Sequence, residues 1–147
     1  MNPLELTGLQ RVQGLMDGSL PQPSMTQTLP MHVVAAAPGK VTFRARADAR
    51  HMNPMGGVHG GFAATVLDSA TGCAVLTMLA AGVSYGTVDL HVKLLRPLPP
   101  DRELTAEARA LQVTRNIGFA EADLRDEQGT LLAHATATCA IFRPREG

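Results

Sequence analysis

Hydrophobic and polar positions alternate along the chain in a pattern that predicts an N-terminal helix followed by a larger domain. Residues 4–20 carry apolar side chains at the spacing of one face of a short amphipathic helix, namely Leu4, Leu6, Leu9, Val12, Leu15 and Met16. Pro21 and Pro23 end this pattern. We therefore expect residues 1–30 to form a helix and a linker, and residues 31–147 to form the main domain.

Strand-like segments occupy most of the main domain. Residues 31–37 and 41–47 predict a hairpin around the turn Pro38-Gly39, with apolar and polar side chains alternating in the second strand. Beyond Gly82, four more segments read as strands, at residues 87–95, 103–114, 117–125 and 131–142, and turn residues separate them. This order favours an antiparallel sheet.

An almost unbroken apolar stretch at residues 61–81 predicts one long helix. A helix that is apolar on every side either spans a membrane or lies buried inside protein. A membrane span needs about 20 uninterrupted apolar residues, whereas this stretch contains Asp68, Ser69, Thr71, Gly72 and Thr77. We therefore expect an α+β fold in which an antiparallel sheet wraps round this central helix, because only a curved sheet covers most of such a helix. A second subunit could cover the rest.

Composition excludes several classes of function. Thirteen basic and thirteen acidic residues are spread along the chain, and aromatic residues make up only 3% of it, so neither a basic face nor stacking platforms for nucleic acid are expected. Cys73 and Cys139 lie in apolar runs without a CxxC pair, which favours reduced thiols and a cytoplasmic protein. The N-terminus lacks the basic start and apolar block of a signal peptide, so neither export nor a membrane partner is expected.

The sequence contains no motif for a zinc site, a serine hydrolase or a P-loop phosphate-binding enzyme. The five histidines have no zinc-ligand spacing, and the chain has neither a G-x-S-x-G elbow nor a P-loop lysine motif. We expect no metal and no cofactor.

Asp68 is the only Asp, Glu, Lys or Arg between Arg50 and Asp89, and it lies inside the predicted buried helix. A buried ionised carboxylate without partners is so unfavourable that it either accepts hydrogen bonds or becomes neutral. One interpretation is a structural carboxylate that caps a neighbouring strand or bonds the hydroxyl of Ser69 or Thr71. The other is a functional acid or base, because perturbed buried acids cluster at functional sites.

The segment Asn53-Pro-Met-Gly-Gly-Val-His59-Gly60-Gly61 leads directly into this helix. Glycines allow close approach of the backbone to a ligand, and the unpaired N–H groups of the first helical turn stabilise an oxyanion. Asn53 adds an amide donor and His59 a ring nitrogen. Alone, such a segment is more often a tight connection. Together with Asp68 it predicts a catalytic site with donors, an acid or base, and water-excluding surroundings.

The spacing Asn53-x5-His59-Gly60-Gly61-x6-Asp68 resembles hotdog-fold thioesterases of the PaaI-like branch, which are related to phenylacetate-pathway and 4-hydroxybenzoyl-CoA thioesterases. The resemblance covers most of the chain and continues at residues 67–70, 86–90, 95–98 and 133–138. It implies a hotdog fold and hydrolysis of an acyl-CoA thioester to a carboxylic acid and free CoA, with coenzyme A as part of the substrate.

The resemblance also implies residue roles. Asp68 would be the general base or the nucleophile, and the N–H of Gly60 would hold the oxyanion. Asn53 would orient the water or the thioester, His59 would support the loop, and Thr87 would help to position the water.

Further positions follow from the same resemblance. In relatives the acid and the glycine loop meet across a dimer interface, so one site would need two chains, and dimers often pair into tetramers. Substrate-binding candidates are Gly61, Ser69, Thr71, Arg96 and Arg115. Many relatives have Gly-Arg-Arg at the turn where this chain has Thr114-Arg115-Asn116. This chain therefore has one arginine fewer at the turn that is expected to contact the CoA phosphates. Arg143 is another candidate for that contact.

Two other functions stay open on the sequence. An acyl-thioester hydratase or dehydratase of the same fold would use His59 with an acid, and a binding protein would hold acyl-CoA without chemistry. The acyl group, and the choice between CoA and an acyl carrier protein, also stay open.

Overall fold

The computed structural model describes residues 2–145. Its helices are α1 (Gly8–Asp17), α2 (Met25–Thr28) and α3 (Gly60–Leu76), with short 3₁₀ helices at Pro3–Glu5 and Ala49–His51. Its strands are β1 (Met31–Ala37), β2 (Lys40–Ala45), β3 (Ser84–Leu94), β4 (Leu104–Val113), β5 (Ile117–Arg125) and β6 (Leu131–Phe142). The predicted order of a helix, two strands, a long helix and four strands is confirmed.

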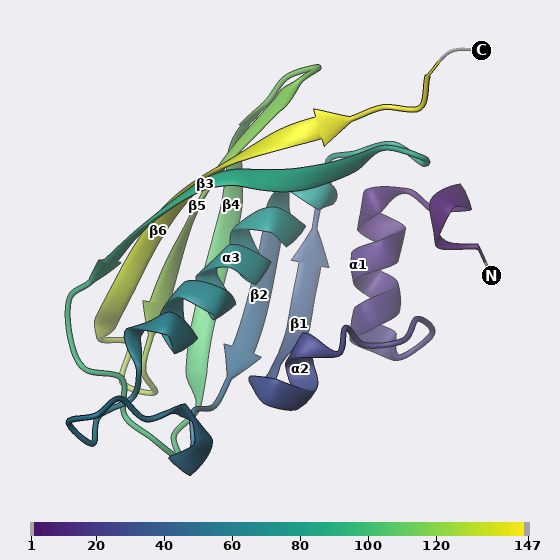
Figure 1. The fold of residues 1–147 in the computed structure, drawn as a ribbon. Coiled ribbons are helices and arrows are strands. Elements are labelled where there is room, and N and C mark those ends of the chain that lie inside the picture. The colour runs from purple at the N-terminus through teal and green to yellow at the C-terminus, as the bar shows by residue number, and fades with distance from the viewer. Residues whose placement is uncertain (1, 146–147) are drawn as a thin grey trace.

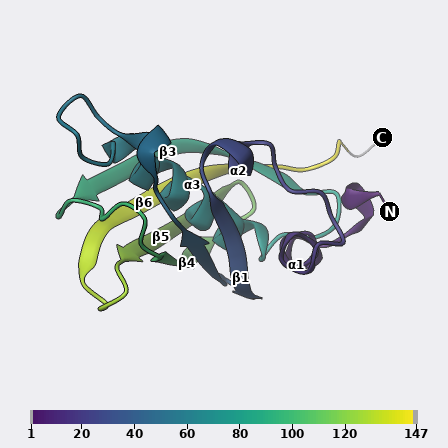
Figure 2. The same ribbon diagram turned by 90° about the horizontal axis from the view of Figure 1, so that it is seen from below.

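The six strands form one antiparallel sheet in the order β1-β2-β4-β5-β6-β3. Helix α3 lies across the concave face of the sheet and packs against β2, β3, β4, β5 and β6 (Figure 1). Seen from below, the sheet curves round this helix while α1 lies to one side (Figure 2). The predicted α+β architecture of a sheet wrapped round a central helix, with a short N-terminal helix, is therefore confirmed.

Small side chains on the inner face let the sheet approach α3 closely. Every second residue of β6 is buried, and most of these residues are alanines, with Cys139 and Ile141 at the end of the series. At Gly118 of β5, an added Cβ would collide with Val75 of α3. The sheet thus covers the apolar helix α3, as expected. Among residues 2–145, no helix is long and apolar enough to cross a membrane.

Three helix boundaries differ from the prediction by three residues or more. Helix α3 ends at Leu76 rather than residue 81, because the hydroxyl of Thr77 donates to Ala74 O (2.7 Å) and accepts from Gly39 N (2.8 Å). Helix α1 begins at Gly8 rather than residue 4, because Thr7 and Gln10 form a capping box. It ends before Gly18, which has a φ of 81° that favours glycine.

Helix α1 holds the C-terminal end of α3. The N–H of Gly8 donates to Leu79 O (2.9 Å), and a Cβ at Gly8 would overlap the carbonyl group of Leu76. Arg11 donates from Nη2 to Val83 O (2.6 Å), at the start of β3. Helix α1 therefore packs onto the main domain, and the domain boundary near residue 30 stays a prediction.

Candidate active site

Asn53 folds the glycine-rich loop back on itself. Its Oδ1 accepts from Met55 N and from Gly57 N, both at 3.0 Å, and its own N–H donates to Gly57 O (2.7 Å). Gly56 has a φ of 84°, which strains any residue other than glycine in this tight turn. The side-chain amide nitrogen of Asn53 has no acceptor within residues 2–145, so it is available to a ligand.

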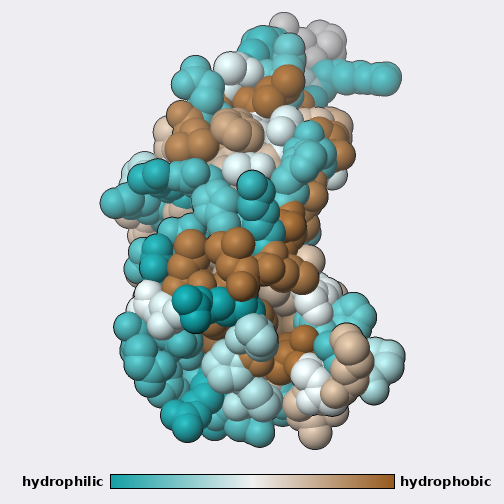
Figure 3. Space-filling view, turned by 90° about the vertical axis from the view of Figure 1, so that its left-hand side faces the viewer, coloured by the Kyte–Doolittle hydropathy of each residue, from teal (hydrophilic) through white to brown (hydrophobic). Residues whose placement is uncertain are grey.

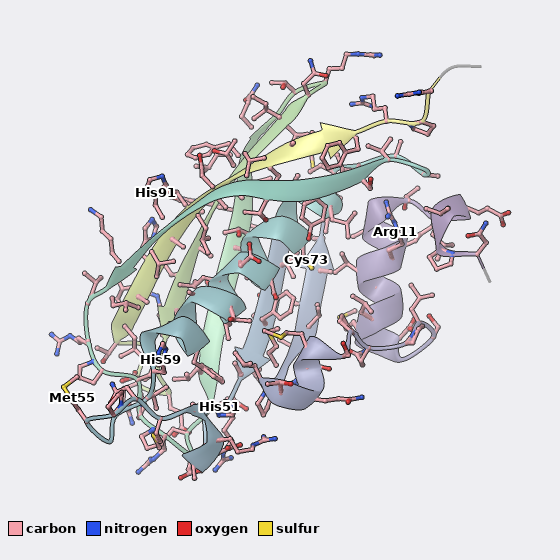
Figure 4. The ribbon with its side chains drawn as sticks, viewed as in Figure 1. Arg11, His51, Met55, His59, Cys73 and His91 are labelled. Carbon is pink, nitrogen blue, oxygen red and sulfur yellow. The ribbon has the colours of Figure 1, made fainter. Side chains whose placement is uncertain are left out.

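His51 anchors the base of this loop, a role that the sequence analysis missed. Its buried ring accepts from Asp48 N at Nδ1 (2.9 Å), so Nε2 carries the proton and donates to Thr28 O (2.7 Å). The backbone carbonyl of His51 accepts from His59 N (2.7 Å). The capping box Asp48-x-x-His51 was the available signal. Figure 4 shows His51 and His59 near the start of α3, with Met55 at the tip of the loop.

His59 caps α3 and leaves one amide free. Its Nδ1 accepts from Gly61 N (2.8 Å), and its carbonyl accepts from Phe62 N (3.0 Å). The N–H of Gly60 has no acceptor within the described chain. Because the positive end of the helix dipole lies behind this amide, Gly60 offers a donor to an oxyanion. The N–H of Gly61 is already engaged with His59.

A groove of about 770 Å³ opens beside this helix start. Its lining includes Asn53, Met55, Gly57, Val58, Gly60 and residues 94–100. A Cβ on Gly60 would lie 2.5 Å from Leu94 Cδ1, so only glycine fits there without displacing that side chain. Figure 3 faces the side where α3 begins and β3 ends, and hydrophobic side chains gather across its middle. Arg96 brings a positive charge to the groove, and no carboxylate lines it.

Asp68 lies two helical turns further along α3. Its residue is half-buried, and its Oδ1 is buried without a hydrogen-bond partner within residues 2–145. The hydroxyl of Thr71 donates instead to the backbone oxygens of Leu67 (2.8 Å) and Asp68 (3.1 Å), and Thr71 is fully buried. Ser69 is half-buried and forms no hydrogen bond with Asp68 in the described part of the protein. The hydroxyl partners that a structural role for the Asp68 carboxylate would need are therefore not engaged with it.

Thr87 lies on β3 at the same level as Asp68. Two close contacts align β3 with α3: Gly60 faces Leu94, and Gly72 faces Tyr85, whose hydroxyl would lie 2.5 Å from an added Cβ. Asp68 lies between Gly60 and Gly72 on α3, and Thr87 lies between Tyr85 and Leu94 on the facing strand. Thr87 pairs with Cys139 of β6 in the antiparallel register. Burial raises the pKa of the Cys139 thiol, and the negative charge of Asp68 raises it further.

The glycine loop and Asp68 lie at different levels of α3. Asp68 follows Gly60 by eight residues in a continuous helix, which separates them by about 12 Å at 1.5 Å per residue. The predicted site residues therefore fall into two candidate half-sites. One contains Asn53, His59, Gly60, Gly61 and Arg96, and the other contains Asp68, Ser69 and Thr87.

Most of these residues lie in the part of the chain that a known protein family matches. The thioesterase superfamily model matches residues 55–133, which include Gly60, Asp68 and Thr87. The chain belongs to this superfamily. The prediction of a hotdog-fold thioesterase is therefore confirmed.

Individual relatives point the same way. This thioesterase-superfamily chain is 31% identical to human acyl-coenzyme A thioesterase 13, over 72% of its own length and 76% of that protein. It is 30% identical to a phenylacetic acid degradation-related protein of Ralstonia eutropha JMP134, with a TM-score of 0.80 over 88% of this chain and 98% of that one. It is 38% identical to a curated Halobacterium salinarum protein over 60% of its own length, and spans 62% of that relative.

Cysteine chemistry does not suit this thioesterase-family site. Burial raises the pKa of the Cys73 thiol to about 12, and the negative charge of Asp68 raises it further. The thiol therefore stays protonated at neutral pH, whereas only the thiolate is an effective nucleophile. Asp68 is the one carboxylate in α3.

Arg115 lies far from the other predicted site residues. It occupies the β4–β5 turn at the top of Figure 1, whereas the loop that carries Asn53 lies at the bottom left. The structure therefore does not bring Arg115 and Arg96 into one cluster.

Proposed function

We propose that this protein hydrolyses an acyl-CoA thioester, with Asp68 as the base or the nucleophile. The observation that carries the proposal is the Oδ1 of Asp68, which is buried without a hydrogen-bond partner among residues 2–145, in a helix that has no other charged side chain. An unpaired buried acceptor is costly, and a water molecule or a substrate carbonyl would engage it. The relative named acyl-coenzyme A thioesterase 13 supports acyl-CoA as the substrate.

The proposed site needs two chains. Gly60 and Asp68 lie about 12 Å apart in one helix, so Gly60 of the partner subunit would supply the oxyanion donor to the thioester that Asp68 attacks. Strand β3 supports this arrangement because it lies at a sheet edge and, in the described part of the chain, is paired only with β6. Its Val88 side chain is 64% exposed. A second copy would pair or cover this edge, which gives a homodimer that could pair again into a tetramer.

Each group has a defined part in the reaction. Asp68 either takes a proton from a water that attacks the carbonyl carbon or attacks that carbon itself, and in the second case a water then hydrolyses the mixed anhydride formed on Asp68. The Thr87 hydroxyl positions the water. The partner's Gly60 N–H stabilises the negative charge on the carbonyl oxygen. Collapse of the intermediate breaks the C–S bond and releases CoA thiolate, which takes up a proton. Thioester and water thus give carboxylic acid and thiol.

The remaining predicted residues support this chemistry. The free amide nitrogen of Asn53 would donate to the thioester or the water, and His59 holds the helix start. Gly61 and Ser69 border the two half-sites, whereas the engaged hydroxyl of Thr71 supports the helix. The proposal includes no separate cofactor, and the two unpaired cysteines favour a cytoplasmic location.

The loop bonds of Asn53 make its role testable. We expect Asn53→Ala to lower kcat about 10- to 100-fold, less than loss of Asp68, because one orienting group is removed. Asn53→Asp is the matched control, since a carboxylate keeps both acceptor bonds to Met55 and Gly57 but loses the amide donor. Steady-state kinetics should show that Asn53→Asp is also impaired. A fully active Asn53→Asp would reduce Asn53 to a loop-forming residue.

Thiol release from a panel of acyl-CoAs tests the function itself. Purified protein would be incubated with acetyl, phenylacetyl, benzoyl and dodecanoyl CoA, and we expect release from at least one of them. The most rapidly cleaved ester identifies the acyl class. Loss of the double bond from an enoyl-CoA without thiol release would instead identify a hydratase. Binding without any reaction would identify an acyl-CoA binding protein.

A further inference from the structure

Arg11 of α1 reaches the residue before β3 with part of its guanidinium group unpaired. It donates from Nη2 to Val83 O (2.6 Å), and its Nε is buried without an acceptor within residues 2–145. Five exposed arginines each lie within 4 Å of a carboxylate, whereas Arg11 has no such partner among the described residues. A buried guanidinium N–H without an acceptor is costly. Arg11 is therefore suited to bind a negatively charged group that the chain does not supply.

A second donor, the hydroxyl of Tyr85, lies two residues after Val83 on β3. An added Cβ on Gly72 would lie 2.5 Å from this hydroxyl, so Tyr85 packs against α3 where glycine leaves room for it. Tyr85 is half-buried, and its hydroxyl forms no hydrogen bond in the described part of the chain. Burial raises the pKa of Tyr85 above its usual range, whereas the Arg11 charge lowers it in part. The hydroxyl therefore stays protonated at neutral pH and is able to donate.

A partly open side of α3 leads from Asp68 to these two donors. In the second half of the helix, the half-buried residues are Asp68, Ser69, Cys73 and Leu76, and the others are buried. Gly72 follows Asp68 by four residues, so the two lie on one face of α3, about 6 Å apart along its axis. The Tyr85 hydroxyl against Gly72 therefore lies about one helical turn beyond Asp68. Figure 4 shows Arg11 on α1 at the same end of the molecule as Cys73.

We propose that this protein prefers acyl groups that end in a carboxylate, the monothioesters of dicarboxylic acids, and that Arg11 and Tyr85 bind that carboxylate. The proposal rests on the proposed function and deepens it by identifying the acyl class. A guanidinium group binds a carboxylate through charge-assisted hydrogen bonds, and the tyrosine hydroxyl adds a third donor. An acyl group that ends in a methyl would instead leave these donors buried and unpaired.

The length of β3 between the two ends of the acyl group sets its size. Val83 lies four residues before Thr87, which is about 13 Å along an extended strand. An extended acyl chain of about eight carbons is about 8 Å long, at ~1.2 Å per bond. Hydrogen bonds of about 3 Å at its two ends complete the span. The expected substrate is therefore a medium-chain dicarboxylic monothioester.

The test compares suberyl-CoA with octanoyl-CoA, which has a methyl group in place of the terminal carboxylate. We expect wild type to have a kcat/KM at least about tenfold higher for the suberyl ester. In Arg11→Met this ratio should fall at least about tenfold, because the carboxylate then enters without a positive partner. Arg11→Lys keeps the charge and should keep the wild-type order of the two esters. Arg44→Met removes an exposed arginine of a surface ion pair and should leave the ratio unchanged.

The ratio of the two esters separates a specificity role from a structural one. Arg11 also bonds Val83 O, so Arg11→Met loosens the packing of α1, and a purely structural defect lowers the rates for both esters equally. An equal fall would therefore overturn the proposal. Tyr85→Phe keeps the aromatic ring against Gly72 and removes only the hydroxyl, so it should lower the ratio about three- to tenfold. An unchanged ratio in both Arg11→Met and Tyr85→Phe would also overturn the proposal.

Thioether analogues separate failure of this proposal from failure of the enzymatic one, because they have no thioester carbonyl to hydrolyse. By calorimetry, wild type should bind S-(7-carboxyheptyl)-CoA at least about tenfold more tightly than S-octyl-CoA, and Arg11→Met should lose this preference. That result would support the carboxylate site even if no thioester were cleaved. Equal affinity of wild type for the two analogues would overturn the proposal. S-(8-hydroxyoctyl)-CoA bound as tightly as the carboxylated analogue would also overturn it, because the site would then select any polar end group.

Discussion

Asp68→Asn is expected to lower kcat for thioester hydrolysis about 10³-fold or more, the scale of a lost general base or nucleophile. The amide has nearly the shape of the carboxylate but cannot accept a proton from water or attack a carbonyl at neutral pH. The measurement is thiol release under single-turnover and steady-state conditions. Both should fall together, because the chemical step itself is impaired.

The same substitution should leave the fold intact. The Oδ1 of Asp68 has no hydrogen bond within the described residues, so replacing it breaks none, and removing a poorly solvated charge stabilises the helix environment. We expect the free energy of unfolding in urea to stay equal or to rise. Glu107→Gln, the same chemical change at an exposed position of β4, should retain full activity. Turnover of Asp68→Asn at the wild-type rate would contradict the assignment of Asp68.

Most of the fold could be predicted because apolar periodicity and turn residues agree along the chain. The predicted bounds of β1, β5 and β6 match the structure, since clear turn residues flank each of these strands. The end of α3 could not be predicted, because apolar residues continue to Ala81 and the helix stops where the Thr77 hydroxyl bonds Ala74 O in its own helix and Gly39 N from the β1–β2 turn. A run of apolar residues predicts that a segment is buried. Where a helix ends depends instead on which backbone N–H and C=O groups find hydrogen-bond partners outside the helix.

The candidate site was predictable only in part, for a related reason. Asp68 can be identified from the sequence because it is a charged residue in an apolar helix. Gly60 can be identified because it is a glycine at the start of that helix. The engagement of Thr71 with its own helix, and of Gly61 N with His59, depends on side-chain conformations that residue type does not determine. The hydrogen bond from Arg143 Nε to Arg115 O depends on how the segment after β6 returns to the β4–β5 turn.

Gly60→Pro is expected to lower kcat about 10²- to 10³-fold, because proline deletes the N–H that would hold the oxyanion. The backbone accepts this change. Gly60 is the first helical residue, where proline is favoured, and the preceding His59 has the extended φ and ψ of −62° and 134° that proline requires of its neighbour. Gly60→Ala is the matched control, since it places the same Cβ against Leu94 but keeps the N–H. It should remain much more active than Gly60→Pro.

Mixing the two inactive variants tests whether the site is shared between chains. A dimer of one Asp68→Asn and one Gly60→Pro protomer has both defects in one shared site and neither in the other. If the protomers assort at random, half the dimers are mixed and each has one intact site, so activity should recover to about a quarter of the wild-type value. Co-expression with two different tags allows the mixed dimer to be purified and assayed. If each site were built within one chain, every site would keep a defect, and the mixture would stay as inactive as its components.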